Sequence, residues 1–189
     1  LNIAQMVLSK YTYKNPNVEP ERQARGNIDQ MLEQAGWEVQ DRDKINLGAS
    51  KGVAVREFPT ENGPADYLLF VSRKAVGVIE AKPEGTTLSG VEDQSEKYAE
   101  GFTEDYNYYE KPLPFVYEST GLKTYFKDLR DEISRSRRVW WFHQPETLEK
   151  WIEQGETLRN RLRKMPDLDI DRLWDCQVDA IEGLEESLK

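Results

Sequence analysis

Cysteine and histidine are nearly absent from this sequence of 189 residues, which contains one of each, Cys176 and His143. A single cysteine cannot form a disulfide within the chain, and the two residues together cannot supply the ligands of a zinc site. No stretch approaches the roughly 18 apolar residues of a membrane-spanning helix, and residues 1–10 lack the features of a signal peptide. The sequence therefore disfavours disulfide scaffolds, zinc enzymes, Cys/His proteases and membrane proteins.

Positive charge is also scarce, since 26 Lys and Arg residues stand against 35 Asp and Glu residues, a net charge of −9. Residues 90–189 hold 23 acidic and 15 basic residues, whereas residues 1–89 hold 12 and 11. Nucleic-acid binding draws its sequence-independent part from neutralised phosphates, so an acidic chain attracts DNA poorly over long distances. We therefore expect any DNA site to be local, assisted by a metal ion, or completed by a partner.

Apolar and aromatic residues are present in the amounts that a folded core requires. Hydrophobic residues make up 38% of the chain and aromatic residues 11%, which excludes a disordered protein. The length suits one or two domains. We expect one domain over residues 1–145 and a helical connector over residues 146–189. We also expect the chain to be a fragment of a longer protein.

The first half of the chain has clear periodic patterns. Apolar residues recur at helical spacing across residues 21–35, and apolar and polar residues alternate across residues 53–58. Two apolar runs, 65–71 and 75–81, are separated by a short polar connection and predict an antiparallel hairpin. The capping-box pattern of residues 89–92 predicts the start of another helix. This order predicts an α/β fold with a mixed central sheet flanked by helices.

The second half has weaker patterns. Residues 112–117 and 138–142 are interpreted as extended segments that could add edges to the sheet. Residues 146–164 and 172–188 have helical apolar spacing and a highly charged surface, which predicts a C-terminal helical appendage.

Charged residues stand at the end of the predicted hairpin. Glu80 and Lys82 are two residues apart and project from the same face of a strand, and antiparallel pairing can bring Asp66 beside Glu80. Two carboxylates suit Mg2+, which polarises a phosphodiester and lowers the pKa of its bound water. The Lys82 ammonium could orient that water and stabilise charge on the phosphate. These residues favour phosphodiester hydrolysis, and the alternative is a solvated sheet edge with a weak ion pair.

These residues resemble the PD-(D/E)xK nuclease superfamily, with Asp66 as the first acid and Glu80-Ala81-Lys82 as the second half of the motif. The family's usual proline stands one residue further away, at Pro64. The chain as a whole resembles the N-terminal endonuclease portion of the R subunit, the restriction and translocation subunit, of type I restriction-modification enzymes. The stretches that carry this resemblance are residues 28–37, 63–67, 80–82, 94–98, 113–121 and 142–148.

The resemblance implies a restriction-endonuclease-like fold and a Mg2+-dependent endonuclease that cleaves double-stranded DNA. It assigns Asp66 and Glu80 to the metal ion and Lys82 to the attacking water. It also implies a bacterial or archaeal cytoplasm, methylation and specificity subunits as partners, and helicase motor domains in the same longer subunit. ATP would serve only that full-length subunit, because the Gly-x-x-x-x-Gly-Lys-Ser/Thr phosphate-binding motif is absent from this sequence. We expect weak or no cleavage by the 189 residues alone.

Three further residues are candidates for the site. Gln94 and Tyr98 share a helix face, and in the nuclease family a Gln-x-x-x-Tyr pair is associated with activity and DNA engagement. A core tyrosine beside an exposed glutamine is the alternative. Glu21, near the apolar stripe of the first helix, is the candidate for an additional metal ligand, and its alternative role is an acid favoured by the helix dipole.

Basic and aromatic residues elsewhere leave their roles open. Some basic residues near the predicted site could follow a DNA backbone, although a solvated surface explains most of them: Arg22, Arg25, Lys44, Lys51, Arg56, Arg73 and Lys74. The densest basic cluster, residues 135–138, suits solubility, DNA or another domain equally. We expect Trp140 and Trp141 to fill a core or a domain interface rather than to stack on bases.

Two other functions compete with a DNA endonuclease. A non-catalytic docking module would keep the nuclease fold and link a DNA motor to its complex, which the acidic second half and the helical appendage favour. An RNA-directed or structure-specific nuclease is the third hypothesis.

Overall fold

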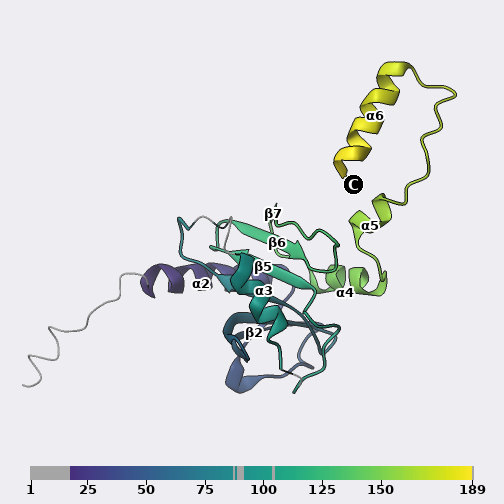
Figure 1. The fold of residues 1–189 in the computed structure, drawn as a ribbon. Helices are drawn as coiled ribbons and strands as arrows, with labels where there is room; N and C mark the ends of the chain where they lie inside the picture. Colours follow the sequence, from purple (N-terminus) through teal and green to yellow (C-terminus); the bar gives the residue numbers. More distant parts are fainter. Residues whose placement is uncertain (1–17, 87, 89–91, 104, 189) are drawn as a thin grey trace, which may run out of the picture.

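A computed structural model describes residues 18–86, 88, 92–103 and 105–188, and it contains a seven-stranded mixed sheet in the order β1 to β7 (Figure 1). The β1–β2 and β4–β5 pairs are parallel and the other neighbouring pairs are antiparallel. The strands are β1 (Glu38–Asp41), β2 (Gly52–Thr60), β3 (Gly63–Val71), β4 (Lys74–Ala81), β5 (Phe115–Ser119), β6 (Thr124–Asp128) and β7 (Arg137–Val139).

Helices flank this sheet, which confirms the predicted α/β class. They are α2 (Val18–Gln34), the short 3-10 helix η1 (Arg42–Lys44), α3 (Glu92–Glu100), α4 (Pro145–Glu153), α5 (Leu158–Leu162) and α6 (Asp175–Leu188). The predicted capping residues 89–91 lie outside the described residues. None of the helices in the described ranges is long and apolar enough to cross a bilayer.

Apolar residues from both faces of the sheet form two cores. Tyr67 and Ile79 pack in the core that contains Ile28 of α2, whereas Leu68 and Val78 pack in the core that contains Ala99 of α3. Neighbouring residues of a strand point to opposite faces, so β3 and β4 are buried from both sides. This explains why both strands read as continuous apolar runs in the sequence.

The predicted β3–β4 hairpin is confirmed, and the sheet beyond it differs from the expectation. The extended segment expected to add an edge is β5, which lies inside the sheet between β4 and β6. The sequence patterns did not reveal β6. Gly77 permits the close approach of β5, because a Cβ at this position would lie 2.2 Å from the carbonyl oxygen of Phe115.

The single helical stretch expected over residues 146–164 is wrong in one respect, because the chain forms two helices there. Gly155, with φ of 67°, follows the end of α4, and the side chain of Thr157 caps α5 by accepting a hydrogen bond from the Asn160 amide. Glycine in this left-handed conformation turns the chain between the two helices. Figure 1 shows α5 and α6 projecting away from the sheet.

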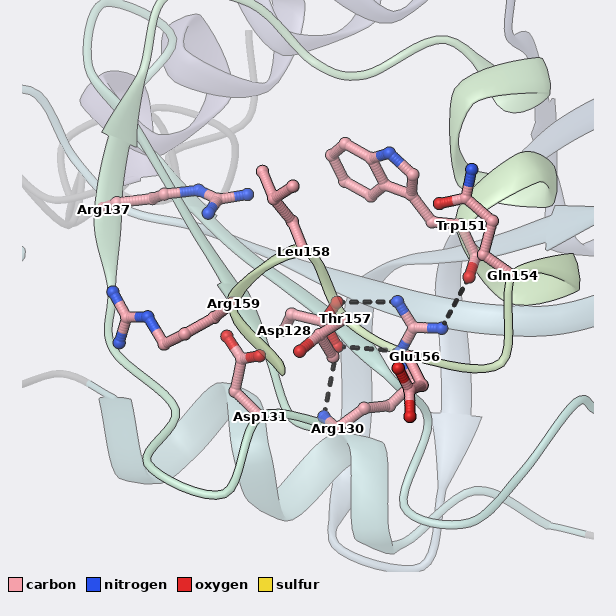
Figure 2. A pocket seen from close by; sticks show the side chains of 10 residues that line it. All are labelled: Asp128, Arg130, Asp131, Arg137, Trp151, Gln154, Glu156, Thr157, Leu158 and Arg159. Carbon is pink, nitrogen blue, oxygen red and sulfur yellow. Dashed lines mark hydrogen bonds and ion pairs between the residues drawn. The ribbon is translucent and has the colours of Figure 1, made fainter. Parts of the chain in front are cut away.

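The C-terminal part of the core includes α4. Leu148 is fully buried, and the Trp151 ring packs against Phe115 and Phe126. Arg130, just after β6, donates hydrogen bonds to Asp128 and to the Trp151 carbonyl oxygen (Figure 2). The packed core therefore continues beyond the division expected at residue 145.

Trp140 and Trp141 were expected to fill a core or a domain interface, and of these the core is wrong, whereas a domain interface stays a prediction. Their exposed fractions are 82% and 46%, and the strand expected over residues 138–142 is β7, which ends at Val139. Phe142 takes the buried position instead, with 3% of its surface exposed.

Candidate active site at the end of the β3–β4 hairpin

Asp66 and Glu80 lie side by side at one end of the β3–β4 pair. The register pairs Tyr67 with Ile79, and continuing it by one residue places Asp66 opposite Glu80. Both side chains are largely buried, with exposed fractions of 11% and 7%. Two acids thus share a confined position that apolar strands and two helices surround.

Two donors hold the Asp66 carboxylate. Its Oδ2 accepts a hydrogen bond from the Ala81 amide at 2.8 Å, and its Oδ1 accepts one from Arg25 Nη2 at 2.5 Å. Arg25 belongs to α2 and also pairs with Glu57 of β2, at 2.9 Å. The first acid is therefore oriented by the backbone of β4 and by a guanidinium from α2.

A chain of hydrogen bonds links Glu80 to α3. Lys82 Nζ lies 2.8 Å from Glu80 Oε1 and 2.8 Å from Gln94 Oε1, and Gln94 Nε2 donates to the Tyr98 hydroxyl at 2.9 Å. The structure thus brings together the five residues that the sequence suggested here, although their catalytic roles stay predictions. The Tyr98 ring is buried in the α3 core and Gln94 is exposed, so a packing role and a site role coincide in this pair.

The surroundings of Glu80 disfavour its charged form. Burial raises its pKa to about 7, the hydrogen bond from Lys82 offsets part of this effect, and the neighbouring Asp66 adds to it. Glu80 Oε2 is buried and has no hydrogen-bond donor among the described residues. A buried carboxylate oxygen without a donor calls for a cation or a proton.

These two acids fit a hard divalent cation such as Mg2+, which takes oxygen ligands and keeps several waters. The described part of the chain contains no group of three or more His, Cys, Asp or Glu side chains arranged around a metal site. The chain would therefore supply Asp66 and Glu80, and water or phosphate would complete the coordination. Glu21 lies within α2, but its side chain is outside the described residues.

A buried acid on β5 positions α3, and the sequence patterns did not reveal it. Glu118 is the neighbour of Glu80 in the parallel β4–β5 register, and it accepts a hydrogen bond from Ser95 Oγ at 2.8 Å. Ser95 is fully buried and directly follows Gln94, the helix residue that accepts a hydrogen bond from Lys82. An acid inside the apolar run of residues 113–121 was the signal that could have indicated this contact.

Several basic residues expected near DNA are paired within the protein. Arg56 binds Asp29 at 2.9 Å and Asp41 at 2.7 Å, and Lys51 binds Glu149 at 2.7 Å. Together with Arg25, these residues use their charge on carboxylates of the fold. They are therefore weaker candidates for phosphate contacts than the sequence alone suggests.

Comparison with known proteins identifies the family. A family model described as the type I restriction enzyme EcoKI endonuclease subunit second domain matches residues 39–152. The chain belongs to this family. The matched range contains Asp66, Glu80, Lys82, Gln94 and Tyr98, and it confirms the resemblance to the R subunit of type I restriction enzymes.

Relatives of this type I family are distant and longer. The chain is 25% identical to the type I restriction enzyme EcoKI endonuclease subunit of Escherichia coli (strain K12) over 222 residues, covering 89% of this chain and 19% of that protein. A solved fragment described as an HsdR subunit of a type I restriction enzyme from Vibrio vulnificus YJ016 matches with a TM-score of 0.51 and 20% identity. That match covers 89% of this chain and 32% of the fragment, and it supports the shared fold. The chain spans about a fifth of the length of the E. coli relative.

Proposed function

We propose that this chain is the Mg2+-dependent endonuclease domain of a type I restriction enzyme R subunit and hydrolyses phosphodiester bonds of double-stranded DNA. The observation that carries this proposal is the pair of buried carboxylates, Asp66 and Glu80, with one Glu80 oxygen lacking a donor among the described residues. Family membership and the PD-(D/E)xK resemblance of the same residues support it.

Asp66 and Glu80 would hold the cation, which when bound polarises the phosphodiester and lowers the pKa of a coordinated water. Lys82 is held between Glu80 and Gln94 by two hydrogen bonds, so its ammonium is fixed at the edge of the acid pair. From there it orients the attacking water and offsets the negative charge that builds on the phosphate. Tyr98 restrains Gln94, and Gln94 in turn restrains Lys82.

The partners follow from the family and belong to the proposal. Double-stranded DNA is the substrate, methylation and specificity subunits complete the complex, and motor domains of the longer subunit use ATP, in a bacterial or archaeal cytoplasm. The net charge of −9 supports this division, because an acidic chain with one local site recruits DNA poorly by itself.

The test is substitution of the proposed site in the reassembled restriction enzyme. Asp66→Ala, Glu80→Ala and Lys82→Ala should each reduce DNA cleavage by on the order of a hundredfold or more while ATP-driven translocation continues. Glu38→Ala, which removes an exposed acid of β1 at the far edge of the sheet, should leave cleavage unchanged. Unchanged cleavage in all three site variants would overturn the proposal.

A docking module is the second candidate function, and the surface of α6 favours it. Leu184 and Leu188 on this helix, and Trp174 just before it, have exposed fractions of 59%, 43% and 77%. Exposed apolar residues of this size are common at protein interfaces. Calorimetric titration with Mg2+ separates the two functions, because a nuclease loses cation binding in Glu80→Ala, whereas a docking module has no cation binding to lose.

A further inference from the structure

The edge strand β7 and the residues after it form a basic and aromatic surface. We name it the β7 edge patch, and it comprises Arg135, Arg138, Trp140 and Trp141. All four are exposed. Residues 133–145 contain no Asp or Glu, although the chain as a whole carries a net charge of −9. The patch is therefore a local positive region with large exposed rings.

The patch shares a face of the sheet with the acid pair. The strand registers align Glu80 with Glu118, Glu118 with Tyr125, and Tyr125 with Arg138 in one row across four strands. Strands lie about 4.8 Å apart, so Arg138 lies roughly 14 Å along the sheet from Glu80. Figure 1 shows β7 at the outer edge of this sheet.

The patch also lies at the same end of the sheet as the acid pair. The same registers align Ala81, Ser119, Thr124 and Val139, which are the terminal residues of their four strands at this end. Lys82 and Trp140 are the next residues along the chain after β4 and β7. Both therefore leave the sheet at one rim.

A groove lies along this rim, between the loop after β4 and the β5–β6 turn. Its lining includes Glu84, Thr86, Thr120, Lys123 and Tyr125. Tyr125 belongs both to this groove and to the row that joins Glu80 to Arg138. Lys123 is exposed and adds a positive charge on the way. Its hydroxyl groups and the Lys123 ammonium suit contacts with a phosphate backbone, and Glu84 at the β4 side is the one acid among the described residues of its lining.

The geometry of the patch suits both the phosphate and the base of a nucleotide. The Arg138 guanidinium lies over one face of the Trp140 ring, 4.7 Å from its centroid, while 82% of Trp140 is exposed. Arginine binds phosphate through a planar set of donors, and an exposed tryptophan ring stacks on an unpaired base. Charge complementarity therefore favours a polyanion over an acidic or neutral protein surface.

We propose that the β7 edge patch binds a locally unpaired strand of the substrate DNA, which continues from the acid pair along the groove. Arg135 and Arg138 contact its phosphates, and Trp140 stacks on one of its bases. This inference rests on the proposed function, which places the phosphodiester to be cut at Asp66 and Glu80. It adds a binding site for the strand on one side of the cut.

The test measures binding without cleavage. The 189-residue chain is titrated against a fluorescein-labelled single-stranded 20-mer in low salt with EDTA, followed by fluorescence anisotropy. Trp140→Ala should weaken binding about tenfold, in the range found for loss of one base–aromatic stack. Arg138→Gln should reduce the slope of log affinity against log salt by about 0.7, the value for one phosphate contact on a single strand.

Arg137→Gln is the matched control. Arg137 is on the same strand and carries the same charge, but its guanidinium lies over the Phe126 ring on the opposite face of the sheet, 5.1 Å from the centroid. It should leave the salt slope unchanged. Far-ultraviolet circular dichroism and thermal melting check that the variants stay folded.

Three results would overturn the patch proposal. They are no measurable binding by the unsubstituted chain, unchanged affinity in both patch variants, and an altered sedimentation coefficient in those variants with unchanged DNA affinity, which would indicate a protein interface. The proposed function fails separately, since cleavage would then survive Asp66→Ala. A tenfold loss of binding in Trp140→Ala would support the patch in either case.

Discussion

Two ion-pair clusters of this sheet are buried to a similar degree and differ in how fully they are satisfied. The Asp128 and Arg130 side chains have exposed fractions of 10% and 13%, and those of Glu80 and Lys82 have 7% and 15%. Both Asp128 oxygens accept hydrogen bonds from Arg130, whose remaining Nη donates to the Trp151 carbonyl oxygen (Figure 2). Glu80 instead keeps one oxygen without a donor in the described part of the chain.

This difference separates a pair that holds the fold from a pair that is available for chemistry. The Asp128–Arg130 pair joins β6 to α4 and has no carboxylate oxygen left for a ligand. Glu80 faces a second acid, and burial raises its pKa, so the free protein holds it in an unfavourable state that a cation would relieve. Burial alone therefore does not mark the candidate site, whereas an unsatisfied buried oxygen beside a second buried acid does.

The largest expected effect is on stability, at the satisfied pair. Asp128→Ala leaves the Arg130 guanidinium buried without its counter-charge, so the free energy of unfolding should fall by about 3–5 kcal/mol. Glu132→Ala removes an acid whose side chain is 77% exposed and should cost less than about 1 kcal/mol. Urea unfolding of both variants measures the difference in unfolding free energy. Equal losses would contradict the view that the buried Asp128–Arg130 pair holds the fold.

A smaller effect is expected at Glu80, where, in contrast to Asp128, replacing the acid should raise the free energy of unfolding at neutral pH. Its pKa is raised from 4.5 to about 7 in the folded protein, so the folded state binds the extra proton in this window. Stability from this group is therefore present at low pH and is lost as pH rises from about 4.5 to about 7, by on the order of 3 kcal/mol. Glu80→Gln removes this dependence of stability on pH, because a glutamine side chain has no proton to lose in this range.

The measurement for Glu80 is the difference between two pH profiles of unfolding free energy. The wild-type chain should lose stability relative to Glu80→Gln between pH 5 and pH 7.5, and saturating Mg2+ should restore part of the loss at the upper end. Parallel profiles would show that the pKa of Glu80 is not raised in the folded protein.

A modest effect is expected at Arg25, which occupies Asp66 Oδ1. The Arg25 side chain is 39% exposed, so its pairing with Asp66 competes with a cation by only about 0.2–1 kcal/mol. Arg25→Ala should therefore raise Mg2+ affinity by up to about fivefold in calorimetry. Arg22→Ala, three residues earlier on α2, controls for the loss of a positive charge. A fall in affinity would instead mean that Arg25 is needed to orient Asp66.

The smallest expected stability change is at Gln94, which is exposed. Gln94→Ala should alter the free energy of unfolding by no more than about 0.5 kcal/mol, because the Gln94 side chain is exposed and its hydrogen bonds to Lys82 and Tyr98 lie at the edge of the site. Cleavage by the reassembled enzyme should nevertheless fall, since Lys82 loses its second acceptor. A large loss of stability would assign Gln94 to the fold rather than to the site.

The sequence was sufficient to predict which side chains of the candidate site lie together where the contacts are local. The alternation of a strand places Glu80 and Lys82 on one face, a short hairpin brings Asp66 to Glu80, and a four-residue helical spacing aligns Gln94 with Tyr98. Each of these arrangements depends on a repeat that can be counted along the chain.

The sequence was insufficient where packing between distant segments decides. Arg25 binds Asp66 and Glu57, which lie 41 and 32 residues away, and only the docking of α2 selects them. Glu118 reaches Ser95 through a parallel strand pair that no short pattern encodes. Trp140 was expected in a core or a domain interface, but within this chain it is exposed and Phe142 is the buried aromatic residue of the segment.

The close approach of β5 at Gly77 has a consequence for how the candidate site could change in evolution. A side chain at Gly77 would meet Phe115, push the two parallel strands apart and carry Glu118, Ser95 and the start of α3 away from Lys82. An uncharged position three residues upstream of Glu80 thus governs whether the ammonium keeps its amide partner. Variation at this glycine would disturb the candidate site while every ionisable residue was retained in the sequence.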